Sequence, residues 1–153
     1  MDTNANNNRE SFEDQQVIFV DTHLIQKAVE GLQRAREEFQ TLLEQAEGGD
    51  PAAYYDLGVR YAEGDGAERD PARAAHWFSL AAEDGDLRAV DLLGRCYQAG
   101  SGVEKDEARA VELFQQAAEQ GYAPGQCDLG LCYENATGVE KDEARAAECY
   151  LQA

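Results

Sequence analysis

The residues of this chain that could carry chemistry are four cysteines, two histidines and a large excess of acidic side chains. Cys96 and Cys132 occupy the same slot in two successive copies of an internal repeat. Neighbouring helices lie about 8 to 10 Å apart, beyond the roughly 7 Å that a disulfide allows between Cα atoms. His23 and His76 have no cysteine or histidine at a metal-ligand spacing. We therefore expect free thiols, no metal site, no cofactor and no catalytic residue.

The elements that would position any functional residue are set by an internal repeat with a step of 36 residues. Glycine recurs at Gly58, Gly94 and Gly130, and the stretch Gly-Val-Glu-Lys-Asp-Glu-Ala-Arg-Ala starts at Gly102 and again at Gly138. A fixed period of this size is typical of a solenoid, in which each unit buries its apolar face on the next unit. A solenoid offers long surfaces rather than enclosed pockets, which disfavours an enzyme.

Each repeat is predicted to contain two short antiparallel helices. In the first copy, Asp50 is a candidate N-cap, and the helix that follows ends near Gly64, where glycine can adopt a left-handed backbone. Asp70 followed by Pro71 opens the second helix by the same chemistry, and Gly85 closes it. The repeat thus reads as helix, turn, helix.

The glycines that recur inside the predicted helices need a steric reason. Gly58, Gly94 and Gly130 each cost about 1 kcal/mol relative to alanine in a helix interior. We attribute them to close approach of the second helix, whose facing residues, such as Ala81 and Ala82, are small.

The repeated pattern resembles the Sel1-like repeat, a relative of the tetratricopeptide repeat. In the first copy the pattern is carried by Ala53, Leu57, Gly58, Tyr61, Gly64, Gly66, Asp70, Ala74, Phe78, Ala81, Ala82 and Gly85. The expected fold is all-α, an α/α solenoid (superhelix) of about three 36-residue helix-turn-helix repeats within residues 48–153, comprising copies 49–84, 85–120 and an incomplete 121–153. The resemblance implies a non-enzymatic adaptor that holds other proteins in complexes, often in bacterial signalling or in protein quality control.

The segment before the repeats has its own pattern. Residues 1–11 are expected to be a disordered tail, and residues 12–47 to form a long N-terminal helix. Its apolar residues alternate steps of three and four, so the helix either caps the first repeat or pairs with a second copy of the chain. The residues assigned to self-association are Ile25, Leu32, Phe39 and Leu42.

A partner-binding surface is predicted on the face opposite the buried stripe of the first helix of each repeat, which is the concave side in related superhelices. Its residues differ between copies while the core residues do not, as a recognition surface would show, although an ordinary solvated face would show it as well. The residues assigned to it are Tyr55, Val59, Asp91, Leu92, Arg95, Gln98, Leu131 and Glu134.

The charge and hydropathy of the chain limit the kinds of partner that it can bind. The 13 Lys and Arg residues against 31 Asp and Glu, net −18, disfavour nucleic acid and anionic lipid, which need clustered cations. A protein or peptide partner, with basic patches, is favoured. No apolar run approaches the roughly 18 residues of a membrane span, and residues 1–10 do not resemble a secretory signal, so we expect no membrane association and a cytoplasmic location.

The incomplete third copy suggests that the chain is a piece of a longer repeat protein. An alternative function follows from this expectation. The chain would then be a recruiting or regulatory module of a longer protein whose catalytic domain is absent here.

Overall fold

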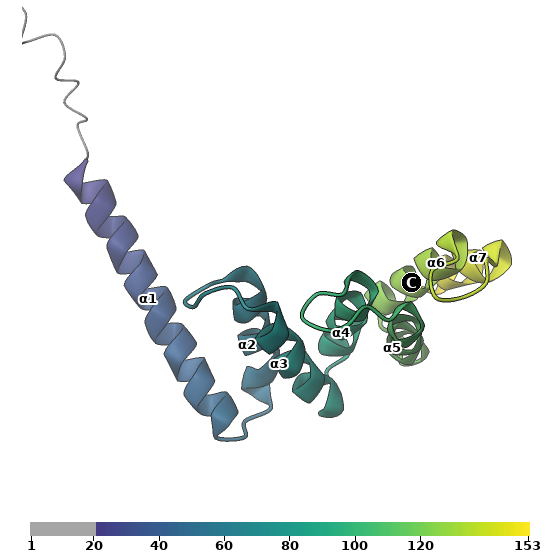
Figure 1. Cartoon of the computed structure of the whole chain (residues 1–153), viewed down its shortest axis with the longest axis horizontal. Coiled ribbons are helices and arrows are strands. Elements are labelled where there is room, and N and C mark those ends of the chain that lie inside the picture. Colours follow the sequence, from purple (N-terminus) through teal and green to yellow (C-terminus); the bar gives the residue numbers. More distant parts are fainter. Residues whose placement is uncertain (1–20) are drawn as a thin grey trace, which may run out of the picture. The chain divides into compact units, whose positions relative to one another are not determined.

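The computed structural model describes residues 21–153, which contain seven helices and no strand (Figure 1). The helices are α1 (Thr22–Glu47), α2 (Ala52–Glu63), α3 (Pro71–Glu83), α4 (Leu87–Ala99), α5 (Glu107–Glu119), α6 (Ala123–Asn135) and α7 (Glu143–Gln152). Residues 32–153 form one compact unit, and the described residues 21–31 belong to another. The predicted tail, 1–11, and residues 12–20 of the predicted N-terminal helix lie outside the described residues. The all-α fold class is confirmed.

Helices α2 to α7 form three two-helix repeats. Each first helix, α2, α4 or α6, packs on the second helix that follows it, α3, α5 or α7, and α3 and α5 also contact the first helix of the next repeat (Figure 1). The buried core runs through these contacts, with Leu57 and Phe114 fully covered. Each repeat therefore buries apolar surface against its neighbour, as the solenoid prediction requires.

The second helices begin where the sequence predicts, because an aspartate caps each of them. The side chains of Asp70, Asp106 and Asp142 accept hydrogen bonds from the backbone N–H groups of Arg73, Arg109 and Arg145 at 3.0, 2.9 and 3.0 Å. A cap of this kind contributes about 1 kcal/mol of helix stability.

The first helices end on a left-handed residue. Gly64 and Gly100 take this conformation with φ of 78° and 68°, and Ala136 takes it in the third repeat with φ of 56°. Left-handed backbone costs a residue with a Cβ about 1 to 2 kcal/mol, so the end of α6 carries strain that its two counterparts avoid.

The glycines inside the first helices make room for aromatic rings, and the expectation that they face small residues such as Ala81 was wrong. A Cβ atom at Gly58, Gly94 or Gly130 would lie 2.6 Å from a ring carbon of Phe78, Phe114 or Tyr150, respectively. In each repeat, an aromatic ring of the second helix therefore fits into the gap left by a glycine of the first helix.

The loop between the two helices of each repeat lies on the preceding second helix. A Cβ atom at Gly102 would collide with the backbone carbonyl of Pro71, and one at Gly138 with that of Glu107. Gly66 makes the same approach to the carbonyl of Ala35 in α1, and all three pairs are 31 residues apart in sequence. Residues 35–47 of α1 thus occupy the place that a second helix takes in each repeat.

Of the four residues of α1 assigned to self-association, two pack against the first repeat and two are exposed. Phe39 is buried and meets the ring of Tyr61 edge-on, with centroids 5.1 Å apart, while Leu42 is half-buried. Ile25 and Leu32 are exposed by 47% and 72%. Of these four side chains, only Ile25 and Leu32 are therefore fully available to a partner along α1.

Candidate functional site

A mainly apolar hollow of about 280 Å³ lies between the first helices α2 and α4. We call it the first-helix hollow. Three residues assigned to partner binding from the sequence, Val59, Leu92 and Arg95, line it together. Phe78 and Cys96 complete its apolar wall, and sequence reasoning did not assign these two residues to the site.

Repeat geometry explains why this hollow is apolar. Val59 and Leu92 are half-buried and pack against the edge of the core, whereas the counterparts of Leu92 in the other two repeats are Asp56 and Asp128. Burial raises the pKa of the Cys96 thiol, so at neutral pH this side chain stays an apolar thiol rather than a thiolate. The hollow can therefore accept an apolar side chain but offers no nucleophile.

Arg95 joins the second and third repeats. Its Nε donates to Oδ2 of Asp128 at 2.7 Å, and its Nη2 lies 3.2 Å from Oδ2 of Asp91. Asp91 is only 3% exposed, so its assignment to the accessible binding surface has to be corrected. The ion pair with Arg95 holds Asp91 on the inner side of α4, while the arginine remains half-exposed at the edge of the hollow.

The ring of Tyr55 packs on that of Phe78, which lines the hollow, with centroids 6.2 Å apart, and it carries a cation on its face. The guanidinium of Arg88 is 3.9 Å from the ring centroid, and Arg88 in turn pairs with Asp86 at 2.6 Å. This hydrogen bond lowers the pKa of the Asp86 carboxyl. Such a stack stabilises the ring orientation by about 0.5 to 1 kcal/mol at an exposed site. Sequence reasoning missed Arg88, because the contact crosses from one repeat to the next.

The remaining three assigned residues lie outside this hollow. Gln98 donates to the thiol of Cys132 at 3.8 Å, and Leu131 is 45% exposed. Glu134 accepts a hydrogen bond of 2.8 Å from the hydroxyl of Tyr150, and this bond raises the pKa of Tyr150 to about 12. Glu134 is thus already engaged within its own repeat.

Two further observations concern other kinds of site. Within residues 21–153, no group of three or more histidine, cysteine or acidic side chains is placed to hold a metal ion. In the same range, none of the helices is both long enough and apolar enough to cross a membrane.

Comparison with protein families gives three consecutive matches. The family model for the Sel1 repeat matches residues 51–86, 88–122 and 123–153. These boundaries fall close to the repeats read from the sequence and to the three helix pairs of the structure. No curated protein matches the chain.

Comparison with solved structures gives similar solenoids. A Sel1 repeat protein from Oxalobacter formigenes is 34% identical with a TM-score of 0.72, over 77% of this chain and 48% of that one. The protective antigen c5321 of uropathogenic Escherichia coli, which has the SLR fold, is 34% identical with a TM-score of 0.68, over 86% of this chain and 32% of that one. The chain thus spans from a third to half of these two proteins.

A more distant match is cysteine-rich protein B of Helicobacter pylori. It is 24% identical with a TM-score of 0.51, over 67% of this chain and 91% of that one, and it shows the fold alone. Together, the three neighbours confirm the α/α solenoid.

Proposed function

The chain belongs to the Sel1 repeat family, whose members generally mediate protein–protein interaction, and from that premise we propose that it is a non-enzymatic scaffold whose first-helix face binds a segment of a partner protein. An apolar side chain of the partner occupies the first-helix hollow. The observation that carries this proposal is that Val59, Leu92 and Arg95, chosen because they vary between repeats, line one apolar depression.

The size and lining of the hollow favour a peptide anchor. A volume of about 280 Å³ accommodates one large side chain, and transferring such a side chain out of water contributes about 1.5 to 3 kcal/mol. Interfaces draw most of their energy from a few anchors of this kind. Tyr55, with its ring fixed by Arg88, offers a second contact next to the hollow.

Charge favours a partner with basic residues near that anchor. The chain carries a net charge of −18, and Glu63 lies at the edge of the hollow. Acidic surfaces of this size steer basic partners and speed their association at low salt.

The test is a substitution that the repeat itself tolerates. Leu92→Asp introduces the residue found at the equivalent Asp56 and Asp128, so the fold is expected to survive. A random peptide library is selected against the full chain, and the selected peptides are measured by fluorescence anisotropy. We expect Leu92→Asp to weaken their binding at least tenfold, because it places a charge in an apolar depression.

The matched control adds the same charge elsewhere. Gln116→Asp changes an exposed residue of the second helix α5 and is expected to leave the affinity within about twofold. If Leu92→Asp binds the selected peptides as tightly as the wild type, or if both variants weaken binding equally, the first-helix hollow is not the binding site.

We also propose that the chain self-associates through α1. Four large apolar residues, Leu24, Ile25, Val29 and Leu32, are exposed by 42% to 72% on this one helix. Water-exposed apolar residues at helical spacing are typical of a helix that pairs with another helix. Phe39, by contrast, is excluded from this surface because it packs on Tyr61.

Sedimentation equilibrium tests this proposal with two neighbouring substitutions. Leu32→Glu is expected to raise the dimer dissociation constant at least tenfold, whereas Gln33→Glu adds the same charge at a polar position and should change it little. A wild-type chain that remains monomeric at every concentration would refute the proposal, as would equal effects of the two variants.

A further inference from the structure

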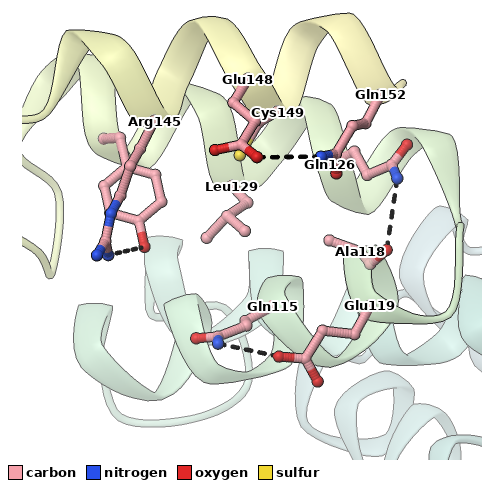
Figure 2. Close-up of a pocket in the computed structure, with 10 residues that line it drawn as sticks. Gln115, Ala118, Glu119, Gln126, Leu129, Arg145, Glu148, Cys149 and Gln152 are labelled. Carbon is pink, nitrogen blue, oxygen red and sulfur yellow. Dashed lines mark hydrogen bonds between the residues drawn. The ribbon is translucent and has the colours of Figure 1, made fainter.

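The junction between the second and third repeats contains two buried polar atoms without a hydrogen-bond partner. Within residues 21–153, these are Oδ1 of Asp91 in α4 and Oε1 of Gln126 in α6, and the two residues are 3% and 6% exposed. Figure 2 shows the amide of Gln126 reaching towards α5, where its Nε2 donates to the carbonyl of Ala118 at 3.4 Å. Because a buried acceptor without a donor costs free energy, and water supplies the donor once the site opens, both atoms weaken this junction.

The third repeat also lacks features that stabilise the second. Helix α6 ends on the left-handed Ala136, whereas α4 ends on a glycine. Gly125 in α6 has no methyl group at the position where Ala89 of α4 is fully buried. Since each repeat of a solenoid contacts only its neighbours, a weakly held repeat can open at a lower free energy than the others.

Two carboxylates share one arginine at this junction. Arg95 places Nη2 3.2 Å from Oδ2 of Asp91, and its Nε donates to Oδ2 of Asp128 in α6 at 2.7 Å. The third repeat also brings the hydroxyl of Tyr122 towards Asp91. Of the described helices, α3 and α5 also pack on α4 but contribute no charge that shifts the titration of Asp91. The group formed by Asp91, Arg95 and Asp128 therefore carries one excess negative charge, which a proton on Asp91 removes.

The burial of Asp91 makes the closed junction bind a proton. Burial raises the pKa of Asp91 to about 6, Arg95 partly opposes this shift, and Asp128 adds to it. When the third repeat opens, Asp91 and Asp128 separate and water reaches the carboxyl, so its pKa falls towards the value of about 3.9 that is usual for aspartate. The proton therefore favours the closed junction fully below about pH 4, and this preference is lost as the pH rises through about 6.

We propose that the third repeat opens from the second as a unit and that a proton on Asp91 holds it closed. Opening separates α6 from α5 and unfolds α6 and α7 together, because short helices without a packing partner are marginal in water. It breaks the hydrogen bond between Arg95 and Asp128 and uncovers the apolar cluster that Phe114 forms with Leu129. The chain thus exposes this apolar surface more often at neutral pH than in mild acid.

Amide hydrogen exchange of the full chain at pH 5 and pH 7.5 tests this proposal. Each measured rate is divided by the rate of an unstructured peptide at the same pH, which gives an opening constant for every amide. We expect α6 and α7 to share one opening constant, at least about tenfold larger than that of α2 and α3. It should rise about tenfold from pH 5 to pH 7.5, because opening lowers the pKa of Asp91 from about 6 to about 3.9.

Two variants identify the group that carries the proton. Asp91→Asn keeps the shape of the side chain without the charge, so its opening constant in α6 and α7 should change less than about twofold between the two pH values. Gln126→Val is the matched control, because it copies Val90 of the second repeat and removes the other unpaired acceptor without removing a titrating group. It should lower the opening constant at both pH values and keep the rise of about tenfold.

Three results would overturn the proposal. Equal opening constants in α2 and α6 would show that no separate unit opens. A rise that persists in Asp91→Asn would show that another group binds the proton, and a rise that disappears in Gln126→Val as well would show that it does not depend on Asp91 alone. The experiment contains no peptide, so none of these results bears on the first-helix hollow.

Discussion

Replacing Gly102 with alanine is expected to lower the free energy of unfolding by about 3 kcal/mol. Two effects add at this position. Gly102 has a φ of 73°, which costs a residue with a Cβ about 1 to 2 kcal/mol. The new methyl group would also collide with the backbone carbonyl of Pro71, and overpacking against atoms that cannot turn away costs a further 1 to 3 kcal/mol, roughly.

The chain supplies a control that separates these two effects. Gly121 has nearly the same backbone conformation, with φ of 78°, but a Cβ there would meet no atom within 4 Å. Gly121→Ala should therefore cost only about 1 kcal/mol. Urea unfolding followed by far-UV circular dichroism measures both variants, and equal losses would show that the close approach of the loop to α3 is not under steric constraint.

The repeat period predicted most of the fold, because the residues that set it act locally. Asp70, Asp106 and Asp142 begin the second helices through their own side chains, and Gly64 and Gly100 end the first helices through their backbone conformation. Such signals need no knowledge of the neighbouring repeat. The number, length and pairing of the helices followed from them.

The residue that faces each helical glycine could not be predicted from the sequence in the same way. The sequence shows that Gly58 must face something close, but it does not show whether the facing residue of α3 is an alanine or the ring of Phe78. The rotation of one helix about its axis relative to the other decides this, and that rotation depends on how the whole interface packs.

The candidate site was predicted in part for a related reason. A helical wheel placed Val59, Leu92 and Arg95 on one face, and the structure brings them together in the first-helix hollow. It placed Asp91 there as well, although Asp91 is covered by contacts that come from the third repeat, including the neighbouring Asp128. The wheel describes one helix and cannot show what the next repeat covers.

The sequence did not predict that residues 35–47 take the place of a second helix, because this role depends on backbone positions rather than on side-chain types. Their sequence carries little of the repeat pattern, yet Gly66 approaches Ala35 as Gly102 approaches Pro71. The hydrogen bond from the amide of Asp50 to the carbonyl of Gln45, at 3.0 Å, likewise has a counterpart one repeat later. Similar backbone positions can be filled by side chains of different types, which a search for repeated residues does not detect.

Asp91 provides the second prediction with a large expected effect, which concerns pH. Burial raises its pKa to about 6, and the neighbouring carboxylate of Asp128 acts in the same direction, while Arg95 partly opposes the shift. In the unfolded chain, aspartate titrates near pH 3.9, roughly. The folded chain therefore binds this proton more tightly than the unfolded chain does. The stability it contributes is fully present below about pH 4 and is lost as the pH rises through about 6.

The variant Asp91→Asn should remove this pH dependence, because an amide resembles the protonated carboxyl and can donate a hydrogen bond to Asp128. A shift of about two pH units corresponds to roughly 3 kcal/mol, so the variant should be about 2 kcal/mol more stable than the wild type at pH 7 and similar to it at pH 4.5.

Asp86→Asn is the control of opposite sign. Arg88 lowers the pKa of Asp86, so its carboxylate stabilises the fold above the unfolded pKa, and this variant should be less stable than the wild type at pH 7. Urea unfolding at the two pH values gives both differences. A loss of stability in Asp91→Asn at pH 7 would mean that the ion pair with Arg95 outweighs the cost of burying the charge.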